Sequence, residues 1–312
     1  MILLTGASGF VGNILSKHLD DLNIPFIAVI RTDASSASYK NSFCVEKMCE
    51  STDWKQALLS VDTVIHLAAR VHVMNEISID PLADFRRLNV ALTKNLAQQA
   101  AKAGVKRFIF LSSIKVNGES TLQEHKFTAD DIPNPEDAYA VSKLEAEQSL
   151  FKIAYDTGME VVIIRSPLVY GPGVKANFQS LMNAVRQGIP LPLASVTVNL
   201  RSLIAVDNLV DFIIKCITHP NAGNQIFLAS DDEDLSTADL LHRMYKAIGT
   251  PDKLFHLPLW CLKLFLMAVR KESVYTRLCG SLQLDINKSK QLIGWKPPLS
   301  VDEGLRRAFG GQ

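Results

Sequence analysis

The sequence predicts an α/β fold, with a doubly wound parallel sheet and a smaller mixed carboxyl-terminal domain. Two observations carry this prediction. Apolar runs of strand length alternate with stretches of helical periodicity, which is typical of a parallel sheet covered by helices. The first apolar run, Ile2-Leu3-Leu4, leads directly into three glycines spaced three residues apart, Gly6, Gly9 and Gly12.

The glycine-containing turn in MILLTGASGFVG suits the pyrophosphate of a dinucleotide. Gly6 permits a tight turn, Gly9 lets the backbone approach the phosphates, and Gly12 lets the next helix pack close to the strand. The helix amino terminus adds N–H groups and a positive dipole end. Three glycines can also form a turn and nothing more. The cofactor contacts predicted here are Gly6, Ser8, Gly9, Phe10, Val11 and Gly12.

The composition narrows the class of protein. The chain has 312 residues, 47% hydrophobic and 21% charged, as expected for a soluble globular protein. A formal net charge of +1 argues against a nucleic-acid partner. Five scattered cysteines without CxxC favour reduced thiols and a cytoplasmic location, and the histidines show no metal-ligand spacing. We expect no signal peptide and no stable membrane insertion, since a strand begins at residue 1 and no apolar run is long enough to span a membrane.

The second predicted strand, residues 26–30, bears on the choice of cofactor. It ends at Arg31, where an arginine suits the 2′-phosphate of NADP(H). Asp33 could instead bind the ribose hydroxyls of NAD(H), and Arg31 could be an ordinary surface residue. We expect NADP(H) or NAD(H), with NADP(H) favoured.

The next elements are expected to bring polar groups to one edge of the sheet. Residues 62–69 form a strand in which Leu67, Ala68 and Ala69 run against the cofactor, and His66 is a packed side chain rather than a catalyst. The other elements predicted in this part are a strand at 43–48, a helix opened by Asp53-Trp54, one long helix over 81–104 that includes Asn89, and a strand at 106–112 that presents Ser113.

The second half continues the alternation and then changes domain. A polar loop over 117–138 covers the site, and we place the domain change at 166–173. Ser236 is expected to cap the helix at 237–248, with Asp239 at its third position. The remaining expected elements are helices at 139–157, 177–188, 206–218, 258–270 and 299–309, strands at 160–165, 202–205 and 225–229, and an extended or loop segment at 191–201. The cofactor domain would span 1–170 with 202–230 returning to it, and the substrate domain 171–201 and 231–312.

Three residues form a candidate catalytic group. Tyr139 and Lys143 are four residues apart and share one face of a helix. An ammonium beside the phenol, with a positive nicotinamide ring, would lower the tyrosine pKa from its usual value near 10. Ser113 would hold a substrate oxygen beside Tyr139 while hydride moves to or from the adjacent carbon. A tyrosine and a lysine at this spacing can also be an exposed helix face.

Taken in order, TGASGFVG, HLAAR, SSIKVNG, YAVSK, RSPLVYGPG, RSLIAVDN and LIGWKPP resemble the extended short-chain dehydrogenases/reductases of the nucleotide-sugar epimerase/dehydratase family. The resemblance covers essentially the whole chain and implies a Rossmann domain with a smaller domain for a UDP-sugar. It adds Asn89 to Ser113, Tyr139 and Lys143 in the active site. The cofactor contacts that complete the predicted set are Arg31, Leu67, Ala68, Ala69, Asn89, Ser112, Tyr139, Lys143 and Pro167, and the predicted substrate contacts are Ser113, Asn177, Arg201 and Arg277.

Two departures from the family pattern narrow the range of reactions that we expect. Family dehydratases carry an acidic pair after the catalytic Ser or Thr, and here Ile114-Lys115 follow Ser113, so dehydration is not expected. Asn117 replaces the usual Tyr of that motif, which puts its substrate contacts in doubt. More closely, SSIKVNGE, AARVHVM and the strand end at Arg31 resemble a bacterial subgroup encoded with surface-polysaccharide (O-antigen) genes. Our leading hypothesis is reduction of a UDP-4-keto-2-acetamido-2,6-dideoxyhexose. The alternatives are a UDP-glucose or UDP-N-acetylglucosamine 4-epimerase and a non-catalytic sensor of the cofactor.

Two surfaces are expected to bear on assembly. Family members often dimerise through the two long Rossmann helices, here 81–104 and 139–157, so we expect a homodimer in which Leu88, Leu92, Leu144 and Phe151 are candidate contacts. The apolar helix at 258–270 is expected to be core of the small domain. Contact of Trp260, Leu264 and Met267 with a membrane surface or partner is the alternative.

Overall fold

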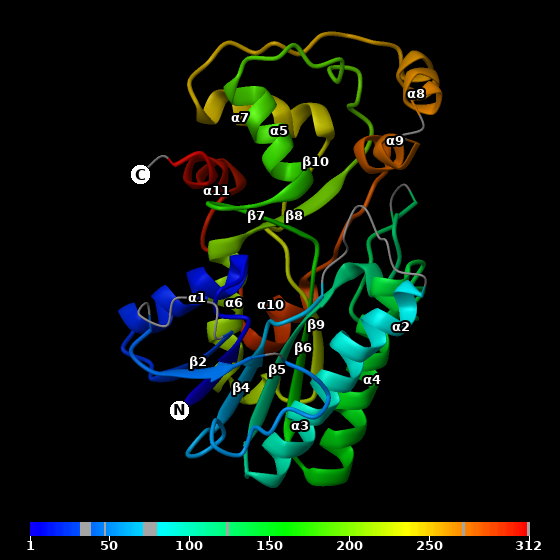
Figure 1. Cartoon of the computed structure of the whole chain (residues 1–312). Coiled ribbons are helices and arrows are strands. Elements are labelled where there is room, and N and C mark those ends of the chain that lie inside the picture. Colours follow the sequence, from blue (N-terminus) through cyan, green and yellow to red (C-terminus); the bar gives the residue numbers. More distant parts are fainter. Residues whose placement is uncertain (32–38, 47, 71–79, 123–124, 270–271, 311–312) are drawn as a thin grey trace.

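The computed structural model describes residues 1–31, 39–46, 48–70, 80–122, 125–269 and 272–310, so Asp33 lies outside it. Within this part, seven parallel strands form one sheet in the order β3-β2-β1-β4-β5-β6-β9 (Figure 1). The strands are β1 (Ile2–Thr5), β2 (Phe26–Arg31), β3 (Ser42–Val45), β4 (Thr63–His66), β5 (Arg107–Ser113), β6 (Glu160–Ser166) and β9 (Gln225–Leu228). The order reverses at β1 and β4, which confirms the predicted doubly wound fold.

Helices cover both faces of this sheet. On one face α1 (Phe10–Asp21) packs on α6 (Val206–Thr218), and on the other α3 (Leu92–Lys102) packs on α4 (Ala138–Thr157) (Figure 1). Successive strand residues alternate between the two cores: Ile109 belongs to the α1/α6 core, and Phe108 and Phe110 to the α3/α4 core. The unbroken apolar strands of the sequence therefore reflect burial on both sides.

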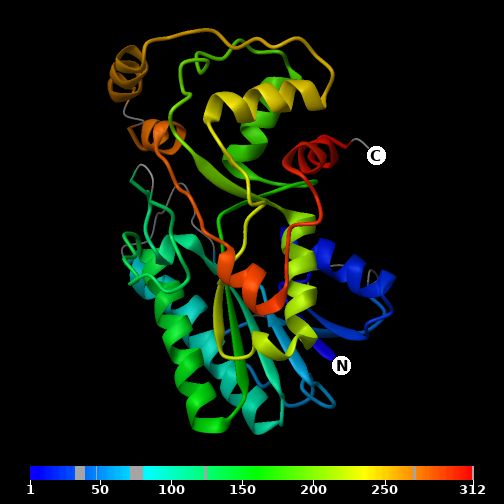
Figure 2. The ribbon, with the colours of Figure 1, turned by 180° about the vertical axis from the view of Figure 1, so that it is seen from behind.

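A smaller domain stands at the carboxyl edge of the sheet. Its three-stranded sheet has the order β10-β8-β7, from β7 (Leu168–Tyr170), β8 (Arg201–Ala205) and β10 (Asp234–Leu235). Its core is packed by α5 (Ala176–Arg186), α7 (Thr237–Ala247) and α11 (Val301–Ala308). Ser236 caps α7 as predicted, because its hydroxyl accepts the Asp239 N–H. Figure 2 shows the chain after α9 (Glu272–Cys279) running down to α10 (Asn287–Ile293) on the large domain.

Several predicted elements differ. Residues 55–60 form turns rather than the predicted helix. The residues just before them are bound by α3, since Asn95 and Gln99 donate to the Thr52 carbonyl and the Trp54 N–H donates to Gln99. The helix at 81–104 is divided into α2 (Pro81–Phe85), a π-helical turn η2 (Arg86–Ala91) and α3. α9 and α10 were not predicted.

The apolar helix α8 (Leu259–Ala268) corrects another expectation. Only Leu262 and Leu266 are buried, whereas the side chains that face solvent include Trp260, Leu264, Phe265 and Met267. These exposed residues are not core, because α8 lies at the rim of the small domain and contacts chiefly α9 (Figure 1). Among the described residues, no helix is long and apolar enough to cross a membrane.

Candidate active site

The glycine turn between β1 and α1 has the geometry of a phosphate cradle. Gly6 has φ +75°, and a Cβ at Gly12 would lie 2.0 Å from the Gly6 carbonyl oxygen, so α1 can approach β1 this closely only with glycine there. Gly9 is the N-cap of α1 and brings no side chain to it. Ser8 and Gly9 are exposed, and Phe10 and Val11 half-buried. The turn therefore fits a dinucleotide pyrophosphate at a helix amino terminus.

The end of β4 lies directly against this turn. A Cβ at Gly6 would come within 2.8 Å of the Ala68 backbone nitrogen, and the Leu67 N–H donates to the Thr5 carbonyl at 3.2 Å. Leu67, Ala68 and Ala69 are half-buried here, as a backbone running along a cofactor requires. Arg31 ends the neighbouring strand β2 and is exposed beside the same edge.

Ser113 and Tyr139 meet where β5 ends and α4 begins. Ser113 is the last residue of β5, and its side chain lies near enough to the Tyr139 phenol to oppose the rise in the pKa of that phenol. Asp137 caps α4 by accepting the Ala140 N–H at 2.7 Å, which fixes Tyr139 in the first helical turn. The sequence-predicted pair is thus brought together by a strand end and a helix start.

Lys143 lies one turn further along α4 and is buried. Its ammonium donates to the Leu111 carbonyl oxygen at 2.8 Å and lies 4.2 Å from the centre of the Phe110 ring. Burial lowers the pKa of Lys143 to about 7, and the nearby Glu147 carboxylate opposes that shift. Lys143 therefore changes charge close to neutral pH.

The tyrosine does not have the lowered pKa that the sequence suggests. Burial, with a smaller contribution from the Asp137 charge, raises the pKa of Tyr139 to about 12, and the Ser113 hydrogen bond only partly offsets this. The Lys143 ammonium is bonded to the backbone of β5 instead. The chain's own groups thus favour the neutral phenol, which is a proton donor.

Asn89 acts on the backbone beside the site. Its amide oxygen accepts the Arg70 N–H at 2.8 Å, and its amide nitrogen donates to the Arg70 carbonyl at 3.1 Å and to the Ser142 hydroxyl at 3.0 Å. Asn89 lies in η2, and π-helical turns occur often at functional sites. It thus ties the chain after β4 to α4, next to Lys143. His66 is a packed residue, bonded to the Thr5 and Thr93 hydroxyls.

The remaining predicted cofactor residues are buried. Pro167 lies between β6 and β7. Ser112 donates its hydroxyl to Glu147 at 2.5 Å, so that hydroxyl serves the protein's own packing. Both lie at the carboxyl edge of the sheet, where ligands of doubly wound folds bind.

The predicted substrate residues belong to the small domain. Arg201, at the start of β8, donates to the Arg277 and Gly280 carbonyls at 3.2 and 3.1 Å. Burial lowers the pKa of Arg201, the nearby Glu119 charge opposes this shift, and the Arg277 charge adds a smaller lowering. Two guanidinium groups of like charge lie close together, which suits an anion such as a diphosphate. Asn177 lies apart from them, exposed on α5.

Sequence reasoning missed a buried polar cluster beneath the catalytic group. Glu147 and Arg165 form an ion pair at 2.6 Å in which both side chains are 2% exposed, and Arg165 also donates to Asn117 at 2.9 Å. Asn117 in turn donates to the Thr128 carbonyl. The signal available was the spacing of Glu147, four residues after Lys143 on one helix face.

The residue that replaces part of the dehydratase acidic pair has a structural role. Lys115 lies in a 3-10 turn and donates to both Glu119 and Asp137 at 2.6 Å. It thereby fastens the loop after β5 to the N-cap of α4. No carboxylate stands at this position to assist elimination of water.

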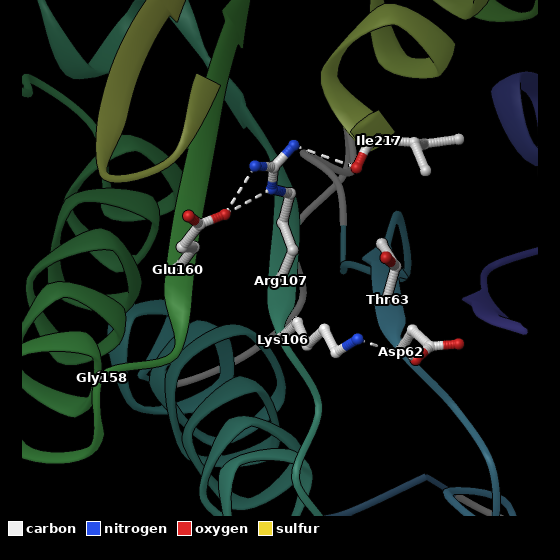
Figure 3. Close-up of a pocket in the computed structure, with 7 residues that line it drawn as sticks. All are labelled: Asp62, Thr63, Lys106, Arg107, Gly158, Glu160 and Ile217. Carbon is white, nitrogen blue, oxygen red and sulfur yellow. Dashed lines mark hydrogen bonds and ion pairs between the residues drawn. The ribbon is translucent and has the colours of Figure 1, made fainter. Parts of the chain in front are cut away.

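A hollow of about 450 Å³ lies at the opposite edge of the sheet (Figure 3). Its charged side chains are already paired: Arg107 binds Glu160 at 2.5 Å, and Lys106 lies 3.8 Å from Asp62. These residues stand at the amino ends of β4, β5 and β6, away from the carboxyl ends that carry the catalytic group. The hollow is therefore separate from the candidate active site.

Fold and site together define a dinucleotide-dependent enzyme of the short-chain dehydrogenase/reductase class. Residues 2–229 match the model of the NAD dependent epimerase/dehydratase family, and the chain belongs to that family. It is an enzyme of the kind that includes nucleotide-sugar 4-epimerases and 4-keto reductases, and NAD is the cofactor of the family.

Curated relatives match along their whole lengths. A UDP-glucose 4-epimerase of Vibrio cholerae is 47% identical over 98% of this chain and 93% of its own. An Escherichia coli O157:H7 N-acetyl-α-D-glucosaminyl-diphospho-ditrans,octacis-undecaprenol 4-epimerase is 26% identical over 99% and 94%. A UDP-glucuronic acid 4-epimerase of Bacillus cereus in complex with NAD superimposes with a TM-score of 0.79 at 21% identity, covering 98% of this chain and 94% of that one. Because its identity is only 21%, the Bacillus cereus structure shows similarity of fold alone.

Proposed function

We propose that this chain is a UDP-sugar 4-epimerase that interconverts UDP-glucose and UDP-galactose or their 2-acetamido counterparts. The observation that carries the proposal is the 47% identity, over nearly the whole chain, to a UDP-glucose 4-epimerase. The Ser113–Tyr139 contact with Lys143 beside it supplies the groups that this reaction needs. The 4-epimerase, the alternative in the sequence interpretation, thus becomes the main proposal.

The chain's residues have distinct roles in this proposal. Bound NAD would take a hydride from sugar carbon 4 and return it to the other face. Ser113 orients the 4-oxygen, and Tyr139 exchanges a proton with that oxygen. Lys143 binds the nicotinamide ribose and provides positive charge near the phenol. Tyr139 would accept the proton of the 4-hydroxyl in the first step and return it in the second, and positive charge from Lys143 and bound NAD would favour the phenolate against the burial that raises the Tyr139 pKa.

The two arginines of the small domain would hold the UDP diphosphate. Arg201 is fixed by two carbonyls of the segment that ends α9, and Arg277 lies in α9. Charged, bidentate hydrogen bonds from guanidinium groups match phosphate oxygens. Asn177 is proposed as a further contact. The sugar would then reach from the small domain to Ser113 at the edge of the large sheet.

A 4-keto reductase is the second candidate, and Arg31 is the observation that favours it. Arg31 ends β2 at the position where an arginine suits the 2′-phosphate of NADP(H). A reductase exchanges its cofactor in each turnover, whereas an epimerase regenerates NAD and gains by retaining it. A cytoplasmic location, a homodimer through α2–α3 and α4, and a role in O-antigen synthesis belong to the proposal as well.

Nucleotide release and product analysis test the proposal together. The purified protein is denatured, and any nucleotide set free is identified. Native protein is then incubated with UDP-glucose and, separately, UDP-N-acetylglucosamine without added reductant. We expect bound NAD(H) and formation of the 4-epimer. An empty site with tighter binding of NADPH than of NADH, and no epimer, would replace the epimerase with the reductase.

A further inference from the structure

The Glu147 carboxylate connects its own helix with two strands, and the three elements meet next to the candidate catalytic residues. It projects from α4, accepts the Ser112 hydroxyl of β5 at 2.5 Å, and is held by Arg165 of β6 through contacts of 3.1 and 2.6 Å. All three side chains are buried. A carboxylate with these partners is fixed in position, because buried charge is tolerated only when it is paired and hydrogen-bonded.

The residues held in this way adjoin the catalytic ones in sequence. Ser112 precedes Ser113, and the Leu111 carbonyl that receives the Lys143 ammonium precedes Ser112. Glu147 lies one helical turn beyond Lys143 on the same face of α4. A single carboxylate therefore connects the strand end that carries Ser113 with the helix that carries Tyr139 and Lys143.

We propose that Glu147 is a positioning residue of the active site. It locks the end of β5 against α4 through Ser112, and it supplies the counter-charge that keeps the Lys143 ammonium charged in a buried site. The part concerning catalysis rests on the proposed function, whereas the part concerning Lys143 does not.

The other groups around Lys143 do not supply this counter-charge. Burial and the nearby lysine lower the pKa of His66 on β4 to about 3, so that ring is neutral. Tyr139 on α4 has a pKa of about 12 and is also neutral. Asp137 is paired with Lys115 at the start of α4, and Arg165 on β6 is itself positive. η2 contributes the uncharged Asn89.

Removal of the Glu147 carboxylate is expected to lower the pKa of Lys143. In Glu147→Gln the Lys143 ammonium loses its counter-charge, and the Arg165 guanidinium loses its carboxylate partner. Both changes disfavour the charged form of Lys143. The Lys143 midpoint, about 7 in the wild-type protein, is expected to fall by about 1 pH unit or more. Under the proposed function, the alkaline limb of the kcat profile moves to lower pH by the same amount.

The chain offers a matched control. Arg107 and Glu160 form another buried-arginine ion pair, which joins β5 to β6 at the amino ends of these strands (Figure 3). Glu160→Gln likewise leaves an arginine that is 7% exposed without its carboxylate. It therefore removes a carboxylate that joins β5 to β6 without removing a charge near Lys143.

The test is a titration of the lysine side chains by NMR on full-length protein labelled with ¹³C and ¹⁵N in lysine. Lys143→Arg assigns the Lys143 signal. We expect a lower Lys143 midpoint in Glu147→Gln and an unchanged one in Glu160→Gln. An unchanged midpoint in Glu147→Gln, or an equal shift in both variants, overturns the proposal. A shift in a protein that epimerises no sugar supports the role of Glu147 and rejects the proposed function.

Two further variants keep the proposal testable if Glu147→Gln does not fold. Glu147→Leu combined with Arg165→Met removes both charges and leaves neither buried alone. The Lys143 midpoint should still fall, and a wild-type midpoint there contradicts the counter-charge role. Ser112→Ala removes only the link to β5, so kcat should fall at least about 10-fold while KM and the Lys143 midpoint stay unchanged. An unchanged kcat contradicts the positioning role.

Discussion

His66 shows how burial fixes the charge of single side chains near the site. Its ring is bonded to the Thr5 and Thr93 hydroxyls at 2.6 and 2.9 Å and stacks on Phe110. Burial, with the Lys143 charge, lowers its pKa to about 3 from an ordinary 6.5. The ring is thus held neutral over the whole range in which an exposed histidine titrates.

A pH dependence of stability follows for His66. Because its folded pKa is lowered, protons bind the unfolded chain first as the pH falls below 6.5. The stabilising contribution is full above pH 6.5 and is lost towards pH 3, at about 1.4 kcal/mol per pH unit. His66→Asn should flatten this part of the curve of unfolding free energy against pH, measured by urea titration. The exposed His125→Asn serves as control, and equal slopes in the two variants would contradict the prediction.

Tyr139 carries the most specific prediction at the scale of a residue. Tyr139→Phe removes the phenol that contacts Ser113 but keeps the ring, whose centre lies 5.9 Å from that of Phe85. We expect kcat for the epimerase reaction to fall about 10²- to 10⁴-fold with little change in melting temperature. Tyr155→Phe is the control, because Tyr155 lies on the same helix and is 92% exposed. Wild-type turnover in Tyr139→Phe would remove the phenol from the mechanism.

Elements whose determinants are local were predicted well from the sequence. The glycine turn, the buried strands and the cap at Ser236 depend on neighbouring residues, and the structure has them where expected. The segment at 55–60 forms turns instead of the predicted helix, and the residues before it, Thr52 and Trp54, are bound by Asn95 and Gln99, some forty residues later, which local patterning does not reveal. The exposure of α8 and the Glu147–Arg165 pair also depend on distant contacts.

The same distinction applies to the candidate site. Ser113, Tyr139 and Lys143 were predicted from spacing and order, and the structure places Ser113 at the end of β5 and Tyr139 at the start of α4, near enough for Ser113 to affect the pKa of Tyr139. Their electrostatics could not be read from the sequence, because the pKa of Tyr139 is governed by burial and that of Lys143 by burial and Glu147. Patterns thus predict candidate reacting groups, and packing governs the pKa values of their side chains.

The turn between β1 and α1 provides the prediction at the scale of an element. In Gly12→Ala the new Cβ would lie 2.0 Å from the Gly6 oxygen, so α1 must move away from β1. We expect a loss of about 1–3 kcal/mol in unfolding free energy and weaker NAD binding, measured by denaturant titration and calorimetry. In Gly9→Ala the Cβ lies 3.1 Å from the same oxygen, so the loss of stability should be smaller. Equal losses would show that close helix packing is not the cause.

At the scale of the molecule, the proposed site would be divided between two domains. The glycine turn and the Ser113–Tyr139 contact belong to the large domain, and Arg201 and Arg277 to the small one (Figure 1). The segment between α9 and α10 joins the domains and is tied to β8, because the Ser202 N–H donates to the Leu282 carbonyl and the Leu284 N–H donates to the Ser202 hydroxyl. A nucleotide sugar held at both ends would therefore bridge the two domains.

A substitution at Arg201 tests whether the small domain binds the UDP-sugar while the large domain binds the cofactor. In Arg201→Gln the charge facing the diphosphate is lost, and we expect the KM for the UDP-sugar and the Kd of UDP to rise about 10- to 100-fold. The affinity for NAD should be unchanged, because the cofactor cradle lies in the other domain. Arg306→Gln, the same change at an exposed pair with Glu303 on α11, is the control. UDP should also raise the melting temperature of the wild-type protein, since a bound anion relieves the repulsion between Arg201 and Arg277. If Arg201→Gln weakens NAD and UDP equally, the arginine stabilises the whole molecule and does not bind the diphosphate.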